Sequence, residues 1–357
     1  MNYNSALRRQ WRATTGAMIG AMIGAAIGGL LLWSGVPSAR ASESAVAVMY
    51  HRFGEDAHPS TNIRIDQFEA HIQELTEGDY TVLPLEKIVD LLSSGERLPD
   101  RAVAITVDDA YRSVYAEAWP RLRKAGLPFT LFVATETVEK GLPAFMTWDQ
   151  IRELRDDGVT IGAHGHSHGH LPRESLDAIR ADIDRSNAIY KRELGAVPVL
   201  FAYPFGETSA DIIKLVRKSG YRAAFGQHSG VMARTLSAFY LPRFALNETY
   251  GSLDRLKLAA NALPIPVTGV TPTDPLVTDA MNPPAFGFTV DETVGSLKRL
   301  ACYHSHSGKA MVQRLGTRRV EVRFPEAFPK GRSRVNCTMP AEQGRWRWLG
   351  MQFYVKP

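Results

Sequence analysis

Short apolar runs alternate with amphipathic stretches along the middle of the chain. Each run has the length of a strand, and each following stretch has the three-to-four-residue apolar spacing of a helix. Alternation of this kind predicts parallel βαβ units. Roughly seven such units over 45–263 lead us to expect an α/β fold with a closed or nearly closed (β/α) barrel. A doubly wound open sheet is the alternative. The clearest apolar runs are 45–50, 102–107, 129–134, 159–163 and 199–203.

The pattern changes after residue 263. Prolines crowd the stretch 264–284, which predicts a linker. Residues 285–357 then alternate apolar and polar positions, as half-buried antiparallel strands do, so we expect a small β-sandwich-like domain there. Both cysteines of the chain, Cys302 and Cys337, fall in this part. An even pair favours a disulfide in an exported protein, with two buried thiols as the alternative.

The first 41 residues predict an export signal. Arg8, Arg9 and Arg12 precede an uncharged run of small and apolar residues, and 39–41 read Ala-Arg-Ala, the small-residue pattern of a cleavage site. Glycines at every fourth position of that run also suit an uncleaved membrane anchor that associates with other helices. Either interpretation places the rest of the chain outside the cytoplasm, secreted or held in the periplasm or cell envelope.

Composition and charge exclude few classes of function, but they argue against nucleic-acid binding. The chain is 45% hydrophobic and 22% charged, as is usual for a globular protein. Its formal net charge is +5, yet the four arginines of residues 1–41 account for all but one unit of it. We therefore expect no nucleic-acid partner. No GxGxxG follows the first predicted strand, so a dinucleotide cofactor is not expected either.

Two adjacent carboxylates end the predicted strand at 102–107. Asp108 and Asp109 follow the run AVAITV, and the carboxyl ends of parallel strands are where ligands bind in α/β folds. Neighbouring carboxylates repel each other unless a cation shares the site. This pair favours a divalent metal bound by one aspartate, with the other free to act as a base. The alternative is a solvent-exposed turn.

Four histidines follow another predicted strand, in the segment GAHGHSHGHL at 162–171. Two of them at H-x-x-x-H spacing, joined by an aspartate from another strand end, form a set suited to zinc or another divalent metal. We expect His166 and His170 to lie outside the ligand set. A third motif, FAYPFGE at 201–207, turns after a strand and can aim a backbone N–H into a site, although such turns are also common without function.

The motifs TVDD, HGHSH and AYPFG, in this order and at these separations, resemble those of the polysaccharide deacetylases of carbohydrate esterase family four, the NodB-homology domain. The resemblance covers about residues 45–250. It implies a distorted seven-unit barrel and metal-dependent hydrolysis of N- or O-acetyl groups on sugars. It further implies that Asp109, His164 and His168 bind the metal, that Asp108 is the general base, and that the main-chain N–H of Phe205 helps to hold the oxyanion.

The chain departs from the family pattern at three places. The usual TFDDG is TVDDA, Ala202 stands where the third motif usually has arginine, and the leucine-x-histidine motif that supplies the acid is not evident near LPRF at 241–244. The segment MYHRF is similar to the YH of poly-N-acetylglucosamine de-N-acetylases, which makes His51 the candidate acid. Arg243 is the candidate replacement for the missing arginine. A structural role is the alternative for both residues.

We therefore expect an exported, metal-dependent hydrolase that removes acetyl groups from a polysaccharide containing N-acetylhexosamine. Zn²⁺ is the expected cofactor, and a membrane partner is expected if the N-terminal segment is not cleaved. One alternative is a de-O-acetylase or deformylase of another cell-envelope glycan. Another is a non-catalytic glycan-binding protein on the same scaffold.

Overall fold

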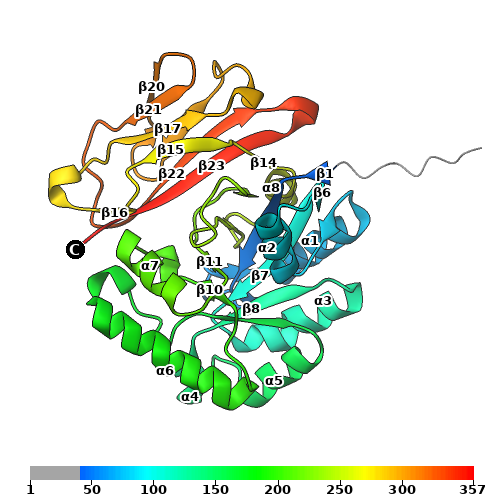
Figure 1. Cartoon of the computed structure of the whole chain (residues 1–357). Coiled ribbons are helices and arrows are strands. Elements are labelled where there is room, and N and C mark those ends of the chain that lie inside the picture. The colour runs from blue at the N-terminus through cyan, green and yellow to red at the C-terminus, as the bar shows by residue number, and fades with distance from the viewer. Residues whose placement is uncertain (1–40) are drawn as a thin grey trace, which may run out of the picture. The chain divides into compact units, whose positions relative to one another are not determined.

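A computed structural model describes residues 41–357 (Figure 1). The predicted signal or anchor lies outside this part, apart from its last residue. Within the described part, no helix combines the length and apolar character needed to cross a membrane. Four short strands pair outside the large sheets: β1 (Ala41–Ser42) with β6 (Leu98–Pro99), and β3 (Arg52–Phe53) with β4 (Asn62–Ile63).

The N-terminal part is an α/β unit built on a curled, 9-stranded sheet that forms a distorted barrel. The strand order is β11-β10-β9-β8-β7-β2-β12, with β13 beside β2 and β5 beside β7. Most neighbours are parallel, as the alternation of apolar runs and helical stretches predicts. The strands are β2 (Ser44–Tyr50), β5 (Thr81–Val82), β7 (Ala102–Asp108), β8 (Phe129–Val133), β9 (Thr160–Ala163), β10 (Leu200–Ala202), β11 (Ala223–Phe225), β12 (Met232–Ala233) and β13 (Phe244–Ala245).

Helices flank this sheet between successive strands (Figure 1). Several begin at a serine or threonine whose hydroxyl accepts a backbone N–H of the first turn, as Thr147, Ser175 and Ser209 do. The helices are α1 (Ile65–Glu77), α2 (Leu85–Ser94), α3 (Trp119–Ala125), α4 (Thr135–Glu139), α5 (Trp148–Asp156), α6 (Leu176–Leu194), α7 (Ala210–Lys218) and α8 (Leu253–Ala260).

Strand β7 explains how the sheet is packed on both faces. All seven of its residues are buried. Val103, Ile105 and Val107 belong to the large apolar cluster that includes most of the helices, whereas Ala102 and Ala104 belong to a second cluster that includes α2. Successive side chains of a strand point to opposite faces, so a strand buried on both faces is apolar throughout. The strand ends at Asp108 and delivers its carboxylate to the end of the sheet.

The C-terminal part is a small β-domain made of two sheets that share one apolar cluster. The 6-stranded sheet has the order β14-β23-β22-β18-β19, with β16 beside β23, and the 4-stranded sheet has the order β15-β17-β21-β20. The first strands are β14 (Leu263–Pro264), β15 (Val267–Thr271), β16 (Leu276–Val277), β17 (Phe286–Val290) and β18 (Ala301–His304). The others are β19 (Gly308–Lys309), β20 (Met311–Leu315), β21 (Arg319–Arg323), β22 (Gly331–Pro340) and β23 (Trp346–Val355).

This arrangement corrects the domain boundary predicted from composition. The stretch 264–284, expected to be a linker, supplies β15 and β16 to the two sheets, so the C-terminal domain begins near Leu263. Proline lacks the N–H that a central ladder position requires, but it is compatible with strand ends and irregular segments. A proline-rich composition therefore does not distinguish a linker from short strands.

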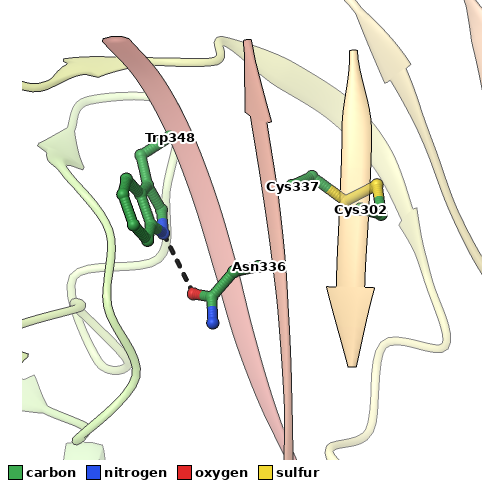
Figure 2. Close-up of a disulfide and its surroundings, with 4 residues drawn as sticks. All are labelled: Cys302, Asn336, Cys337 and Trp348. Carbon is green, nitrogen blue, oxygen red and sulfur yellow. Dashed lines mark hydrogen bonds between the residues drawn. A yellow bond between two sulfur atoms is a disulfide. The ribbon is translucent and has the colours of Figure 1, made fainter. Parts of the chain in front are cut away.

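A disulfide joins two neighbouring strands of the larger C-terminal sheet. Figure 2 shows Cys302 on β18 bonded to Cys337 on β22, and the two residues are also directly opposite each other in the antiparallel ladder. On the next strand, β23, Trp348 donates from its indole nitrogen to Asn336 Oδ1 at 2.9 Å. Both cysteine side chains are fully buried in the apolar cluster of the domain.

Candidate functional site

The two aspartates at the end of β7 take different directions because the backbone changes conformation between them. Asp108 is the last residue of the strand, whereas Asp109 has φ 77° and Ala110 has φ 53°. Both values lie in the left-handed region, which aspartate adopts more readily than most residues. The N–H of Asp109 still donates to Phe132 O of β8 at 3.0 Å. The backbone thus holds two carboxylates at one strand end in separate environments.

Asp109, His164 and His168 come together as the sequence predicts. Asp109 Oδ1 lies 3.4 Å from His164 Nε2 and 3.1 Å from His168 Nε2, and the three ligand atoms all lie within 4.8 Å of one another. His164 follows β9, and His168 lies four residues further on, with φ 54°. Atoms bonded at roughly 2.0–2.1 Å around one tetrahedral zinc ion are separated by about 3.4 Å. The spacing of these atoms therefore fits a shared divalent cation.

The hydrogen bonds of this cluster support the same conclusion. His164 Nδ1 is 2.7 Å from Ala202 O, which fixes the proton on Nδ1 and leaves the lone pair of Nε2 free. Within residues 41–357, the buried atoms Asp109 Oδ1 and His164 Nε2 have no hydrogen-bond partner. Buried polar atoms are nearly always satisfied, so two orphaned atoms facing each other point to a missing ligand. Two imidazole nitrogens and one carboxylate oxygen suit zinc or a similar divalent metal.

Asp108 is held by Arg243 instead of by the metal cluster. Arg243 Nη1 donates to Asp108 Oδ1 at 2.7 Å and Nη2 donates to Oδ2 at 2.8 Å, with both side chains fully buried. Further bonds from Arg243 to Thr106 Oγ1 and Gly226 O fix the guanidinium. Burial by itself would raise the pKa of Asp108, but the cationic Arg243 reverses this effect and places that pKa below its ordinary value.

His51 completes the surroundings of Asp108. It follows β2, which is the direct neighbour of β7, and its Nε2 lies 4.0 Å from Asp108 Oδ2. Burial is the main influence on His51 and lowers its pKa below the ordinary value. Arg243 arrives from the residue before β13, on the other side of β2. The structure therefore places both candidate residues, His51 and Arg243, beside Asp108, while their chemical roles stay predictions.

The two remaining histidines of the loop make contacts outside the cluster. His166 is buried, and its Nδ1 lies 2.8 Å from Thr135 Oγ1. His170 is partly exposed, with Nδ1 2.7 Å from Glu207 Oε2. Asp182 of α6, which sequence analysis did not single out, accepts the backbone N–H groups of His166 and Ser167 at 2.7 and 2.9 Å. It fixes the path of the loop, and no sequence pattern marked it.

Phe205 lies at the centre of the third motif in an uncommon backbone conformation. Its φ is 58°, and Gly206 follows with φ 68°. A Cβ on Gly206 would lie 2.4 Å from Gln227 N, so the position requires glycine. The ring of Phe205 stacks on His170 at 4.3 Å and meets His168 edge-on at 4.6 Å. No backbone carbonyl among residues 41–357 accepts the N–H of Phe205.

Comparison with known proteins identifies the same region of the chain. Residues 95–224 match the family model described as polysaccharide deacetylase. A poly-beta-1,6-N-acetyl-D-glucosamine N-deacetylase of Staphylococcus aureus (strain N315) is 25% identical over 233 residues, covering 57% of this chain and 79% of that protein. The protein YxkH of Bacillus subtilis (strain 168), assigned to the polysaccharide deacetylases, is 24% identical over 196 residues, with 55% and 69% coverage.

Solved structures share the fold of the N-terminal part. The Streptococcus pyogenes deacetylase PplD, in complex with acetate, superimposes with a TM-score of 0.57 at 22% identity, over 61% of this chain and 98% of that one. IcaB from Ammonifex degensii gives a TM-score of 0.53 at 24% identity, over 61% and 96%. The family match falls on the part of the chain that carries the Asp-His-His cluster, so residues 95–224 belong to the polysaccharide deacetylase family.

Proposed function

We propose that this protein is an exported, divalent-metal-dependent deacetylase that hydrolyses acetamide groups of a polysaccharide containing N-acetylhexosamine. One observation carries the proposal: the carboxylate of Asp108, buried and held by two hydrogen bonds from Arg243, adjoins the cluster of Asp109, His164 and His168. A carboxylate kept apart from a ligand set is what hydrolysis with a general base requires. The S. aureus relative named as an N-deacetylase of poly-beta-1,6-N-acetyl-D-glucosamine supports the substrate class.

The chain supplies a group for each proton and charge in this reaction. A divalent cation, proposed here as Zn²⁺, supplies Lewis acidity and lowers the pKa of water when it is bound. Asp108 accepts the proton of the attacking water, with its two oxygens oriented by Arg243. In its protonated form, His51, 4.0 Å from Asp108, donates a proton to the leaving nitrogen. The N–H of Phe205, which donates to no backbone carbonyl among the described residues, bonds to the developing oxyanion.

Metal analysis and acetate release test this proposal together. Purified protein is loaded with zinc and assayed on N-acetylglucosamine oligomers, with O-acetylated oligomers in parallel. We expect acetate from the former and at least a hundred-fold loss of turnover in Asp108→Asn, because general-base catalysis contributes typically 10²–10⁴-fold. Zinc content is expected to stay unchanged in this variant. The matched control is Asp156→Asn, which changes an exposed carboxylate at the end of α5.

Three results bear on the assignment. If zinc-loaded Asp108→Asn turns over substrate at the wild-type rate, Asp108 is not the general base. If acetate is released only from the O-acetylated oligomers, the protein is a de-O-acetylase and the proposed de-N-acetylation is wrong. A protein that binds acetylated oligomers and zinc but releases no acetate from any of them is a glycan-binding protein on this scaffold.

We also propose export to the periplasm or cell envelope, on the basis of the N-terminal arginines, the apolar run and the Ala-Arg-Ala pattern. Fractionation of cells that express the full chain tests this location. N-terminal sequencing of the mature protein distinguishes cleavage after residue 41 from an uncleaved anchor.

A further inference from the structure

The C-terminal β-domain contacts the Phe205 turn through directed hydrogen bonds. Gln352 of β23 donates from Nε2 to the carbonyl oxygen of Phe205 at 3.0 Å. The hydroxyl of Tyr240 lies 3.1 Å from Gly206 O and 3.3 Å from Gln352 O, so it connects the turn to the same strand. The side chain of Gln352 is almost completely buried. The two consecutive carbonyls of the turn, those of Phe205 and Gly206, are thus both held at this contact.

The turn needs such support because its backbone is strained. A non-glycine residue in the left-handed region, like Phe205 with φ 58°, costs on the order of 1–3 kcal/mol and persists where its surroundings impose it. An N–H that stabilises an oxyanion must also be fixed before the reaction, because its effect depends on distance and angle. Gln352 and Tyr240 supply this constraint from outside the third motif.

A second contact reaches the turn from the neighbouring strand β22. Glu207 is buried, and its carboxylate lies 2.7 Å from His170 Nδ1 and 3.5 Å from Arg332 Nε. The guanidinium carbon of Arg332 is 5.5 Å from the centre of the Phe205 ring, within range of a cation–π interaction. The ring also contacts His170 and His168. Arg332 therefore helps to press the turn against the histidine loop.

We infer that the C-terminal β-domain completes the active site, with Gln352 and Arg332 as positioning residues that fix the Phe205 turn against the histidine loop. The inference rests on the proposed function in one respect, the use of the Phe205 N–H by the oxyanion. The geometric part stands without it. Both positioning residues lie more than a hundred residues beyond the segment 95–224 that matches the family model.

The variant Gln352→Glu tests the inference with little change in size. It keeps the oxygen that accepts from Arg334 Nε at 3.0 Å, but it replaces the donor to Phe205 O with a carboxylate oxygen. We expect a ten- to hundred-fold loss of kcat with a smaller change in KM and unchanged zinc content, because a displaced oxyanion donor weakens mainly the transition state. Hydrogen–deuterium exchange of the peptide covering 203–207 is expected to increase.

Arg345→Gln is the matched control at another contact between the two parts. It removes the ion pair of Arg345 Nη1 with both carboxylate oxygens of Asp100, at 2.9 and 3.0 Å, and touches no residue of the Phe205 turn. We expect a lower Tm but wild-type kcat and wild-type exchange over 203–207. If Gln352→Glu does not fold, Arg332→Met, which changes a partly exposed side chain, is measured by the same readouts.

The two readouts separate failure of this inference from failure of the proposed function. If exchange over 203–207 is the same in Gln352→Glu and in Arg345→Gln, the domain does not hold the turn and the inference is overturned, whatever the substrate. If exchange rises only in Gln352→Glu while the wild type releases no acetate from any acetylated oligomer, the positioning is supported and the proposed function fails. Raised exchange with unchanged kcat overturns the catalytic use of the Phe205 N–H.

Discussion

A buried histidine at the contact between the two parts of the chain makes stability depend on pH in a way that can be calculated. His228 is 3% exposed, and its ring packs against that of Tyr240 at a tilt, with centroids 4.6 Å apart. Its Nδ1 has no hydrogen-bond partner within the described residues. Burial, and then the positive charges of Arg334 and Arg243, lower the pKa of His228 from 6.5 to about 3. The folded protein therefore keeps this side chain neutral.

The sign and size of the effect follow from this difference. The unfolded chain binds a proton at His228 below pH 6.5, and the folded chain does so only near pH 3. His228 therefore does not reduce the free energy of unfolding above pH 6.5, but it reduces it progressively as the pH falls toward 3, because proton binding stabilises the unfolded state. Each pKa unit corresponds to about 1.36 kcal/mol, so acidification from pH 7 to pH 5 costs about 2 kcal/mol through this residue alone.

The perturbation is His228→Gln, which has a similar size and no charge in this range. Chemical denaturation is followed by tryptophan fluorescence at pH 5, 6 and 7, with a chelator present so that metal release does not contribute. We expect the wild type to lose about 2 kcal/mol more than the variant between pH 7 and pH 5. His71, whose pKa burial also lowers, is unchanged in both proteins and leaves a common residual slope. His58→Gln, at an exposed histidine, is the control.

Equal pH dependence in the wild type and in His228→Gln refutes the reasoning. It would mean that the imidazole is protonated in the folded state, which requires solvent access or a partner that the structure does not provide. If the wild type is more stable at pH 5 than at pH 7, the predicted direction of the pH dependence is wrong.

Three further predictions concern the metal cluster, the disulfide and the barrel. His168→Ala, at a partly exposed position, is expected to abolish the zinc-induced rise in Tm without unfolding the protein; a retained rise contradicts its place in the ligand set. The double variant Cys302→Ser, Cys337→Ser is expected to lower the free energy of unfolding by about 4 kcal/mol, because the disulfide closes a loop over a separation of 35 residues. A decrease of less than about 1 kcal/mol in chemical denaturation contradicts this prediction. Gly162→Ala places a Cβ 2.4 Å from Phe132 Cδ1, so we expect a loss of about 1–3 kcal/mol in thermal unfolding, and an unchanged Tm argues against this tight packing.

The sequence predicted those parts of the site that belong to regular elements. Asp108 and Asp109 end a buried strand and His164 follows another, and parallel strands bring their ends to one edge of the sheet. The strand pattern therefore indicated the place of the metal cluster, and the resemblance to the family implied its three ligands. Arg243 and His51 were named from the departures from family motifs, and the structure places both beside Asp108.

Other residues could not be predicted because their contacts depend on how distant segments fold back. Glu207 meets Arg332, and Phe205 meets Gln352, across more than a hundred residues of chain, with no period or motif to connect them. Asp182 lies on the long helix α6, where an acidic residue usually indicates an exposed face. The start of the C-terminal domain was missed because short strands and proline-rich linkers have similar composition.

The position of Arg243 has a consequence for any attempt to reduce this protein to a minimal fragment that keeps the site. The segment 95–224 carries the three groups that can hold a cation, together with Asp108. The arginine that grips this carboxylate and the imidazole nearest to it, that of His51, both enter from strands outside that segment. A truncated protein made from the segment alone would keep these four side chains but lose the arginine and the histidine that surround Asp108. Grafting the cluster together with the surroundings of Asp108 onto another scaffold therefore requires β2 and β13 as well.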